Sequence, residues 1–247
     1  MKKDLSILKT ALIAHRGLHN ESDVPENSMP AFEKAVEAGL IIELDIHILK
    51  DGEIIVFHDD DLKRMCGIDR PVADYTFKEL SEVKLLKSDI GIPKFKDVLD
   101  MVGGRVPVIV EFKYDTPVGP LEAKAARLLD AYKGPFVIKS FHPMIVRWFK
   151  LNRPQYIRGL LIPERGHEFR QNLLADMWLE PLAKPDFLSV DYHLCTHHKV
   201  MRFKKKMPII AWTIKSQKTL FKYSKYFDNM ICEDIFDEKL LSTYRVG

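Results

Sequence analysis

Short β-rich runs alternate with helix-like segments along the whole chain, and this alternation constrains the fold more than any other feature. Runs of β-branched and aromatic residues predict eight strands: Thr10–Ala14, Leu40–Leu49, Val106–Phe112, Phe136–Ser140, Ile157–Leu161, Phe187–Val190, Ile209–Thr213 and Met230–Cys232. Helical periodicity between them is clearest in five segments: Ala31–Ala38, Lys94–Val102, Leu121–Tyr132, Pro143–Leu151 and Gln217–Tyr226. Eight such units predict an α/β chain folded as a closed, parallel (β/α)8 TIM-type barrel.

The length of the chain fits a barrel that uses all of it. The 247 residues match the about 250 residues that one such barrel needs. No linker or low-complexity segment interrupts the sequence, so we expect residues 1–247 to form one domain. An open doubly wound sheet is the alternative. Such a sheet usually has a glycine-rich turn after its first strand, and His15-Arg16-Gly17 is not one.

One further strand does not belong to the barrel count. Glu53–His58 is β-like, but only Lys50-Asp51-Gly52 separates it from the strand before it. Asp-Gly between apolar runs is a hairpin signal, and so short a loop cannot make a parallel crossover. We therefore expect an antiparallel hairpin, followed by a small insertion at about residues 59–91 on the same end of the barrel.

The hairpin also predicts a register. If Asp51-Gly52 is a two-residue turn, Lys50 faces Glu53 and the pairing continues back along both strands. Asp45 then lies directly opposite His58, and facing residues project from the same side of a sheet. The hairpin would thus deliver His58 to the face that carries Asp45.

The composition is that of a globular chain without a strongly charged partner. The formal net charge is +3, which argues against nucleic acid as a partner. Three cysteines without metal-ligand spacing indicate free thiols in a reducing compartment. No apolar run approaches the about 18 residues of a membrane span. We expect a cytoplasmic protein without stable membrane association, and the oligomeric state is left open.

Charged and polar residues gather at the predicted carboxyl ends of the strands, where barrels of this kind hold their functional groups. The set is His15, Arg16, Glu43, Asp45, His47, His58, Asp59, Glu111 and Lys113. Taken singly, each has an ordinary interpretation as a salt-bridge partner, a polar strand end or a turn residue. Three carboxylates, Glu43, Asp45 and Glu111, would repel one another at one barrel mouth unless a cation lay between them. Oxygen ligands suit Mg²⁺ or Ca²⁺ better than Zn²⁺, with Mn²⁺ a further candidate.

Short motifs resemble those of the glycerophosphodiester phosphodiesterases over nearly the whole chain. The family's opening signature is similar to Ala14-His15-Arg16-Gly17 and Pro25-Glu26-Asn27-Ser28. Its second block resembles Glu43-Leu44-Asp45-Ile46, Lys50-Asp51-Gly52 and Val56-Phe57-His58-Asp59 in order and spacing. Weaker matches follow at Ile92-Pro93, Glu111-Phe112-Lys113, Ser140-Phe141 and Trp212-Thr213.

This resemblance implies an enzyme that hydrolyses glycerophosphodiesters to glycerol 3-phosphate and an alcohol with the help of a divalent cation. His15 and His58 would act as general acid and base, and the cation would be held by Glu43, Asp45 and Glu111. Arg16 and Lys113 would lie beside the phosphate oxygens. Trp212, at a predicted strand end, is a candidate apolar wall against glycerol or a head group. The nucleophile is either water or the substrate's 2-hydroxyl.

Two departures from the family pattern leave the substrate preference open. Leu49 stands where the family usually has threonine, and Cys232-Glu233-Asp234 replaces the usual terminal threonine-aspartate. A phospholipase-D-like or lysophospholipase-D-like enzyme, acting on lipids through the same site, is one alternative and would need an exposed apolar rim at the barrel mouth. A non-catalytic binding protein on the same barrel is the other. It would show a degenerate site, whereas here every expected catalytic position is filled.

Overall fold

The computed structural model describes residues 3–20, 23–114, 116–164, 166 and 179–244. Its strands are β1 (Ile13–Ala14), β2 (Ile41–Ile48), β3 (Ile54–Val56), β4 (Val108–Phe112), β5 (Phe136–Ser140), β6 (Arg158–Ile162), β7 (Phe187–Asp191), β8 (Ile209–Ile214) and β9 (Asn229–Cys232). Its α-helices are α1 (Met29–Glu37), α2 (Lys63–Cys66), α3 (Phe77–Leu80), α4 (Phe95–Val102), α5 (Pro120–Ala131), α6 (Pro143–Asn152), α8 (Glu180–Ala183), α9 (His198–Lys204), α10 (Gln217–Tyr223) and α11 (Glu238–Tyr244). Short 3-10 turns are η1 (Ser6–Lys9), η2 (Val72–Asp74), η3 (Tyr192–Thr196) and η4 (Ser224–Tyr226).

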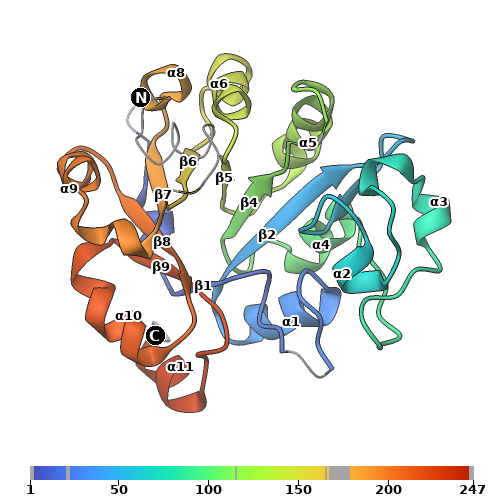
Figure 1. The fold of residues 1–247 in the computed structure, drawn as a ribbon, viewed down its shortest axis with the longest axis horizontal. Helices are drawn as coiled ribbons and strands as arrows, with labels where there is room; N and C mark the ends of the chain where they lie inside the picture. Colours follow the sequence, from blue (N-terminus) through green and yellow to red (C-terminus); the bar gives the residue numbers. More distant parts are fainter. Residues whose placement is uncertain (1–2, 21–22, 115, 165, 167–178, 245–247) are drawn as a thin grey trace.

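Eight of the strands close into a parallel barrel. The sheet order is β1, β9, β8, β7, β6, β5, β4, β2, β3, and β1 also pairs with β2, which completes the circle. Only β3 is antiparallel, and it pairs with β2 on the outside of the barrel. Helices surround the strands in Figure 1, and each of the eight predicted strands corresponds to a barrel strand. The predicted TIM-type barrel is confirmed.

The strands bury both faces, as the near-continuous apolar runs require. Alternate residues such as Ile42 and Leu44 face the helices and pack with Phe32 and Val98 of α1 and α4. The residues between them face the barrel interior. There a separate apolar layer is formed by Ile13, Ile41, Ile109, Val137, Phe187, Ile210 and Ile231, with Leu8 of η1 packed against it. This layer fills the half of the interior nearest the amino ends of the strands.

The hairpin forms, but its predicted register is wrong by one residue. Leu49 N–H donates to Glu53 O at 2.8 Å, and the facing pairs above it are Ile48 with Ile54 and Ile46 with Val56. The loop therefore has three residues, and its last, Gly52, takes the left-handed φ of 79°. A three-residue loop that ends in a left-handed glycine is the next most common hairpin connection after the two-residue turns.

The one-residue shift in register puts a different residue opposite Asp45, but His58 still lies in the site. Phe57 now lies opposite Asp45, and its N–H donates to Asp45 O at 3.0 Å. The chain leaves the ladder after Val56, so strand alternation does not fix the direction of the His58 side chain. His58 and Asp45 line the same cavity. His58 and Asp45 are thus close together as expected. Their proximity results from the turn that follows β3 and not from direct pairing across the hairpin.

Residues 59–91, expected to be an insertion, form a small cluster beside the hairpin. They contain α2, η2 and α3, which lie next to the end of β2 in Figure 1. Apolar side chains of this segment, among them Met65, Val72 and Leu80, pack with Ile55 and Phe57 of the hairpin in their own hydrophobic cluster. Among the described residues, the model has no helix long and apolar enough to span a bilayer.

We predict that Gly17, in the loop after β1, cannot be replaced by alanine without a large loss of stability. Its φ is 84°, and a Cβ there would lie 2.9 Å from backbone and side-chain atoms of Ala31. Gly39 is a matched control, because its φ is 69° but nothing lies within 4 Å of its Cβ position. Gly39→Ala should cost about 1–2 kcal/mol of unfolding free energy and Gly17→Ala about 2–5 kcal/mol. Urea titrations of both variants measure the difference, and equal losses would contradict it.

Candidate active site

A layer of charged side chains lies inside the barrel, directly above the apolar layer. Glu43 and Asp45 follow Ile41 at steps of two along β2, so all three point to the same face. The strand register places Asp45 beside Glu111 of β4, and Glu111 beside Lys139 of β5. These four charged residues are each no more than 5% exposed. Parallel pairing therefore brings three carboxylates and an ammonium group together inside the barrel.

Two lysines form ion pairs with the three buried carboxylates. Lys113 Nζ lies 2.8 Å from Asp45 Oδ1 and 2.8 Å from Glu111 Oε1. Lys139 Nζ lies 2.9 Å from Glu43 Oε1 and 3.1 Å from Glu111 Oε2. Buried charges are tolerated only in such paired arrangements, because an unpartnered charge loses its hydration without compensation. Lys113, expected beside the phosphate, thus contacts carboxylates, whereas Lys139 reaches the cavity described below.

Arg16 adds a third positive charge from the loop after β1. Its backbone has a left-handed φ of 55°, and its N–H donates to Glu43 Oε2 at 3.1 Å. Its guanidinium donates to Glu26 Oε1 at 2.8 Å and lies 3.5 Å from Asp45 Oδ2. Asn27 completes this side of the site, because its Nδ2 donates to the same Asp45 oxygen at 2.9 Å.

The charges of this cluster keep one another ionised. Burial alone would raise the pKa of Asp45, but Lys113, His58 and Arg16 outweigh burial and hold it well below its usual value. Burial would likewise raise the pKa of Glu111, and Lys113 and Lys139 lower it. Burial lowers the pKa of Lys113, but Asp45 and Glu111 more than compensate and raise it. At neutral pH Asp45, Glu111 and Lys113 are therefore all charged.

Each of the two predicted catalytic imidazoles is held by a carboxylate. His15 Nδ1 lies 2.6 Å from Glu233 Oε2, on the turn after β9, and His58 Nδ1 lies 2.7 Å from Asp59 Oδ1. Lys215 holds the other oxygen of Glu233 at 2.9 Å. A carboxylate at Nδ1 favours the tautomer with the proton on that nitrogen. Nε2 of each ring then remains to exchange a proton with a ligand.

A charged chain links His58 to Arg16. Arg64 of α2 donates to both oxygens of Asp59, at 2.7 and 3.1 Å, and to both oxygens of Glu26, at 2.9 and 2.6 Å. Glu26 in turn accepts from Arg16 at 2.8 Å. Residues of the 59–91 segment therefore help to hold the second histidine and the arginine in place.

His47 takes a different position from the two site histidines. It is fully buried, and its Nε2 lies 3.2 Å from the backbone carbonyl oxygen of His58. A carbonyl only accepts, so Nε2 of His47 is the donor. His47 thus fixes the backbone of the residue that carries the second imidazole.

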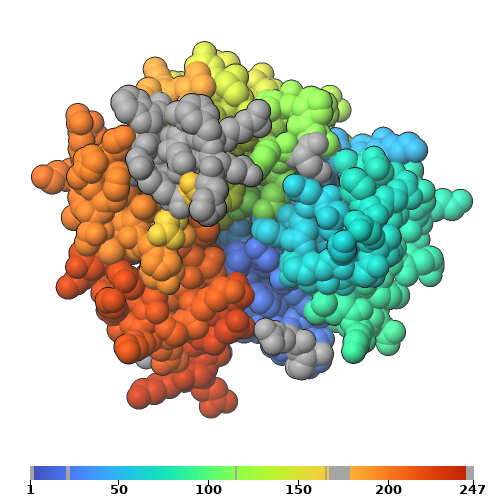
Figure 2. All heavy atoms as spheres, viewed as in Figure 1, coloured from blue at the N-terminus to red at the C-terminus, as the bar shows by residue number. Residues whose placement is uncertain are grey.

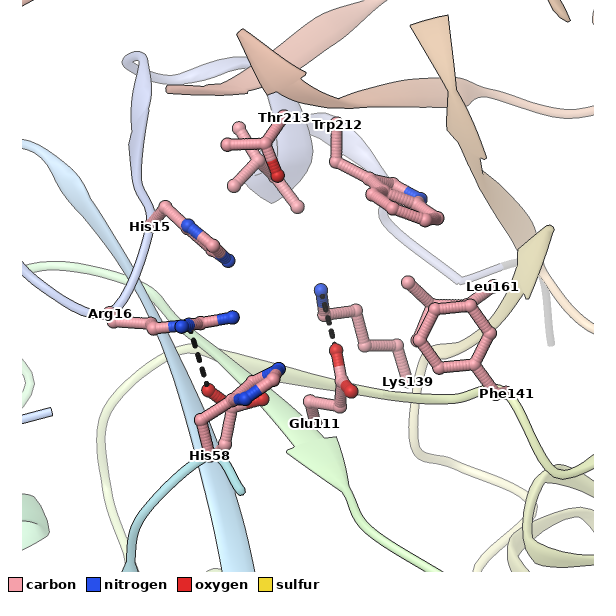
Figure 3. A pocket seen from close by; sticks show the side chains of 11 residues that line it. His15, Arg16, His58, Glu111, Lys139, Phe141, Leu161, Trp212 and Thr213 are labelled. Carbon is pink, nitrogen blue, oxygen red and sulfur yellow. Dashed lines mark ion pairs between the residues drawn. The ribbon is translucent and has the colours of Figure 1, made fainter. Parts of the chain in front are cut away.

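These groups border a cavity of about 120 Å³ at the carboxyl end of the barrel. Figure 3 shows His15, Arg16 and His58 on one side of it, with Glu111 and Lys139 between them and the opposite wall. That wall is apolar and consists of Trp212, Phe141 and Leu161. The indole packs edge-on against the Phe141 ring at 5.6 Å, and its Nε1 donates to Ser189 O at 3.0 Å. Trp212 therefore lies where the sequence predicts an apolar wall.

The carboxylates could also hold a metal ion. Glu43, Asp45 and Glu111 each offer an oxygen, and these oxygens all lie within 4.8 Å of one another. Within the part of the chain that the structure describes, Glu43 Oε1 is buried and accepts no well-directed hydrogen bond, although Lys139 Nζ lies 2.9 Å from it. Three clustered carboxylate oxygens fit a hard divalent cation such as Mg²⁺ or Ca²⁺.

Comparison with known proteins identifies the family. The pattern that defines the glycerophosphoryl diester phosphodiesterase family matches residues 15–237. The chain belongs to this family. A glycerophosphodiester phosphodiesterase of Caldanaerobacter subterraneus subsp. tengcongensis is 32% identical over 97% of this chain and 100% of its own length. The chain is accordingly an enzyme, a hydrolase of phosphoric diesters.

Solved structures of the family share the fold. A glycerophosphodiester phosphodiesterase from Parabacteroides distasonis superposes with a TM-score of 0.77, at 21% identity, over 98% of both chains. A phosphodiesterase from Oleispira antarctica, in complex with the product sn-glycerol-3-phosphate, gives a TM-score of 0.75 at 19% identity, over 90% of this chain and 92% of its own.

Several residues that shape the site are not among those predicted from the sequence. Glu233 is noted there only as a departure from the family pattern, and Glu26, Asn27 and Lys139 are given no role. The one signal for Lys139 is a lysine within the apolar strand Val137-Ile138-Lys139, comparable to the glutamate that marks β4. The partnership of Glu233 with His15 has no such local signal, because 218 positions separate the two residues.

We predict that acid weakens the fold through the two carboxylates that hold the histidines. Burial would raise the pKa of Asp59 and of Glu233, but their imidazole and cationic partners lower both. A carboxyl whose pKa is lower in the folded state stabilises the fold above its unfolded pKa, near 4. That stability is lost as pH falls further. The melting temperature should therefore drop from about pH 5 to pH 3, and Glu233→Gln should reduce the slope. If the melting temperature of Glu233→Gln fell with pH as steeply as that of the wild type, the ion pair between Glu233 and His15 would not contribute to stability.

Proposed function

We propose that this protein hydrolyses glycerophosphodiesters to glycerol 3-phosphate and an alcohol, with His15 and His58 as general acid and base and a divalent cation at the carboxylates. The observation that carries the proposal is the arrangement of the two imidazoles. Each is held at Nδ1 by a carboxylate, and both face one cavity beside Glu43, Asp45 and Glu111. The substrate class is that of the family and of the Caldanaerobacter relative, and the Oleispira structure holds the corresponding product.

The imidazoles suit the two proton transfers of diester cleavage. One must remove a proton from the attacking hydroxyl, and the other must protonate the alkoxide that leaves. Neutral and protonated imidazole are both accessible near pH 7 because the ordinary pKa lies near 6.5. Asp59 and Glu233 hold Nδ1 of their partner rings, which leaves Nε2 of each ring for the substrate. Water or the substrate's own 2-hydroxyl would serve as the nucleophile.

The remaining charges suit the phosphate. Arg16 lines the cavity between the histidines, where its guanidinium would bind non-bridging oxygens. Lys139 lines the same cavity, and Lys113 contacts Asp45 and Glu111, which also line it. A bound divalent cation would neutralise charge on the phosphate as the transition state forms. Glu43, Asp45 and Glu111 are the residues that would hold it, and Trp212 and Phe141 would contact the glycerol carbons.

We also propose that residues 1–247 form one catalytic domain, in which the 59–91 segment is an insertion that both supports His58 and borders the substrate. Asp59 and Arg64 are its contribution to the histidine. Cys66, Cys195 and Cys232 are free thiols, in keeping with the reducing, cytoplasmic location that we propose.

Removal of divalent cations should abolish hydrolysis. The buried carboxylates and the phosphate are all anionic, so turnover should need Mg²⁺, Ca²⁺ or Mn²⁺. Release of glycerol 3-phosphate from glycerophosphocholine, measured before and after chelation, tests this, with metal added back as the control. Full activity of the metal-free enzyme would remove the cation from the proposal. Choline release from lysophosphatidylcholine in the same assay would point to the lipid alternative.

Loss of either site imidazole should slow turnover without unfolding the protein. His15→Ala and His58→Ala should each lower kcat by about 10²–10⁴-fold, the usual contribution of general acid–base catalysis. His47→Gln is the matched control, because glutamine can still donate to the His58 carbonyl and no proton transfer is assigned to His47. If His47→Gln were as damaging as His58→Ala, the wrong histidine would have been chosen.

A further inference from the structure

A second hollow, wider than the catalytic cavity, lies on the other side of His15. It has a volume of about 560 Å³ and lies between the loop after β1 and the segments that follow β8 and β9. Its lining includes His19, Lys215, Asp234, Phe236 and Asp237. In Figure 2 the blue N-terminal residues and the red C-terminal residues meet in the recessed centre of the face shown. We call this hollow the alcohol groove.

A chain of side-chain contacts places the alcohol groove next to the catalytic cavity. His15 lines the cavity, its Nδ1 lies 2.6 Å from Glu233, and Glu233 lies 2.9 Å from Lys215, which lines the groove. One residue, Glu233, therefore separates the imidazole from the groove. A phosphodiester has an ester arm on each side of its phosphorus atom. If glycerol lies against Trp212, the second arm must extend away from that wall.

The charged side chains of the alcohol groove differ in whether they already have a partner. Lys215 is paired with Glu233, and Glu233 is shared with His15. Asp237 accepts from the Gln217 side chain at 2.8 Å and from the Leu240 N–H at 2.7 Å, at the start of α11. Asp234 is exposed and bonds to no other residue that the structure describes. It is the carboxylate of the groove that remains available to a ligand.

A buried ring nitrogen and an aromatic ring point to a ligand in the alcohol groove. Asp234 stands beside them with a left-handed φ of 59°, a backbone conformation that aspartate and asparagine adopt more readily than most other residues. His19 Nε2 is buried and, within the described part of the chain, has no hydrogen-bond partner. Phe236 adds an aromatic ring to the same lining. A carboxylate beside an aromatic ring suits an organic cation.

We propose that the alcohol groove receives the leaving alcohol of the substrate, and that Asp234 and Phe236 select a cationic head group of the choline or ethanolamine type. The proposal rests on the function proposed above and adds the substrate preference that the family resemblance leaves open. Asp234 attracts the positive nitrogen, Phe236 contacts its carbons, and His19 offers a ring nitrogen to a polar atom of the alcohol. A glycerol or other neutral alcohol gains only the last of these contacts.

The test compares Asp234→Asn with the wild-type protein on glycerophosphocholine, glycerophosphoethanolamine and glycerophosphoglycerol. Asparagine tolerates the left-handed backbone of position 234, so the fold should persist. We expect kcat/KM to fall about three- to fivefold for the two cationic diesters, the upper size of a solvent-exposed ionic contact, and to stay nearly unchanged for the neutral diester. Glu37→Gln, an exposed position at the end of α1, is the control for the change in net charge.

The outcomes are separable. An equal fall on all three diesters, or a wild-type protein that prefers the neutral diester, would overturn the proposal. A wild-type protein that hydrolyses none of them would instead overturn the proposed function. Raised ionic strength gives a second reading, because salt should weaken the preference for cationic diesters in the wild type and leave Asp234→Asn unchanged. A preference that does not respond to salt would contradict an ionic contact.

Discussion

Inside the barrel, the paired charges of Glu43, Asp45, Glu111, Lys113 and Lys139 are the interaction on which the rest of the site depends. None of these groups could be buried alone, because each would lose its hydration without compensation. Together they form a nearly dry ionic layer above an apolar one. The apolar layer below it keeps the interior packed, so the charged layer has only one open side. That side is the catalytic cavity.

The site combines rigid and adjustable parts. Glu43 and Asp45 come from the middle of β2, and Glu111 comes from next to the end of β4; strand pairing fixes the backbone of all three. Both imidazoles and Arg16 come from turns just beyond strand ends, and their positions depend on side-chain partners such as Glu233 and Asp59. In the function that we propose, a cation would need fixed ligand distances, and proton transfer would need imidazoles that can follow the substrate. The division between strands and turns suits these two needs.

Much of this arrangement could be predicted from the sequence, since each barrel strand is an apolar run between turn-forming residues. The polar residues that break those runs indicate the charged layer. The hairpin register could not be predicted, because Lys50-Asp51-Gly52 is compatible with both a two-residue and a three-residue loop. A two-residue type I′ turn needs a left-handed backbone at both Asp51 and Gly52, whereas here Gly52 is left-handed and Asp51 is not. Contacts such as that of Glu233 with His15 arise only from barrel closure, which no local pattern reports.

Closure of the barrel also sets when the enzyme can first work. His15 belongs to the first strand and Glu233 follows the last, and β1 is held between β2 and β9. A growing chain that has not yet left the ribosome as far as β9 has an open sheet, with the edges of β1 and β8 exposed. His15 therefore gains its contact with Glu233 only after β9 and the turn that follows it have been synthesised. Activity should appear only at the end of synthesis, and until then the exposed edges of β1 and β8 are open to pairing with other chains.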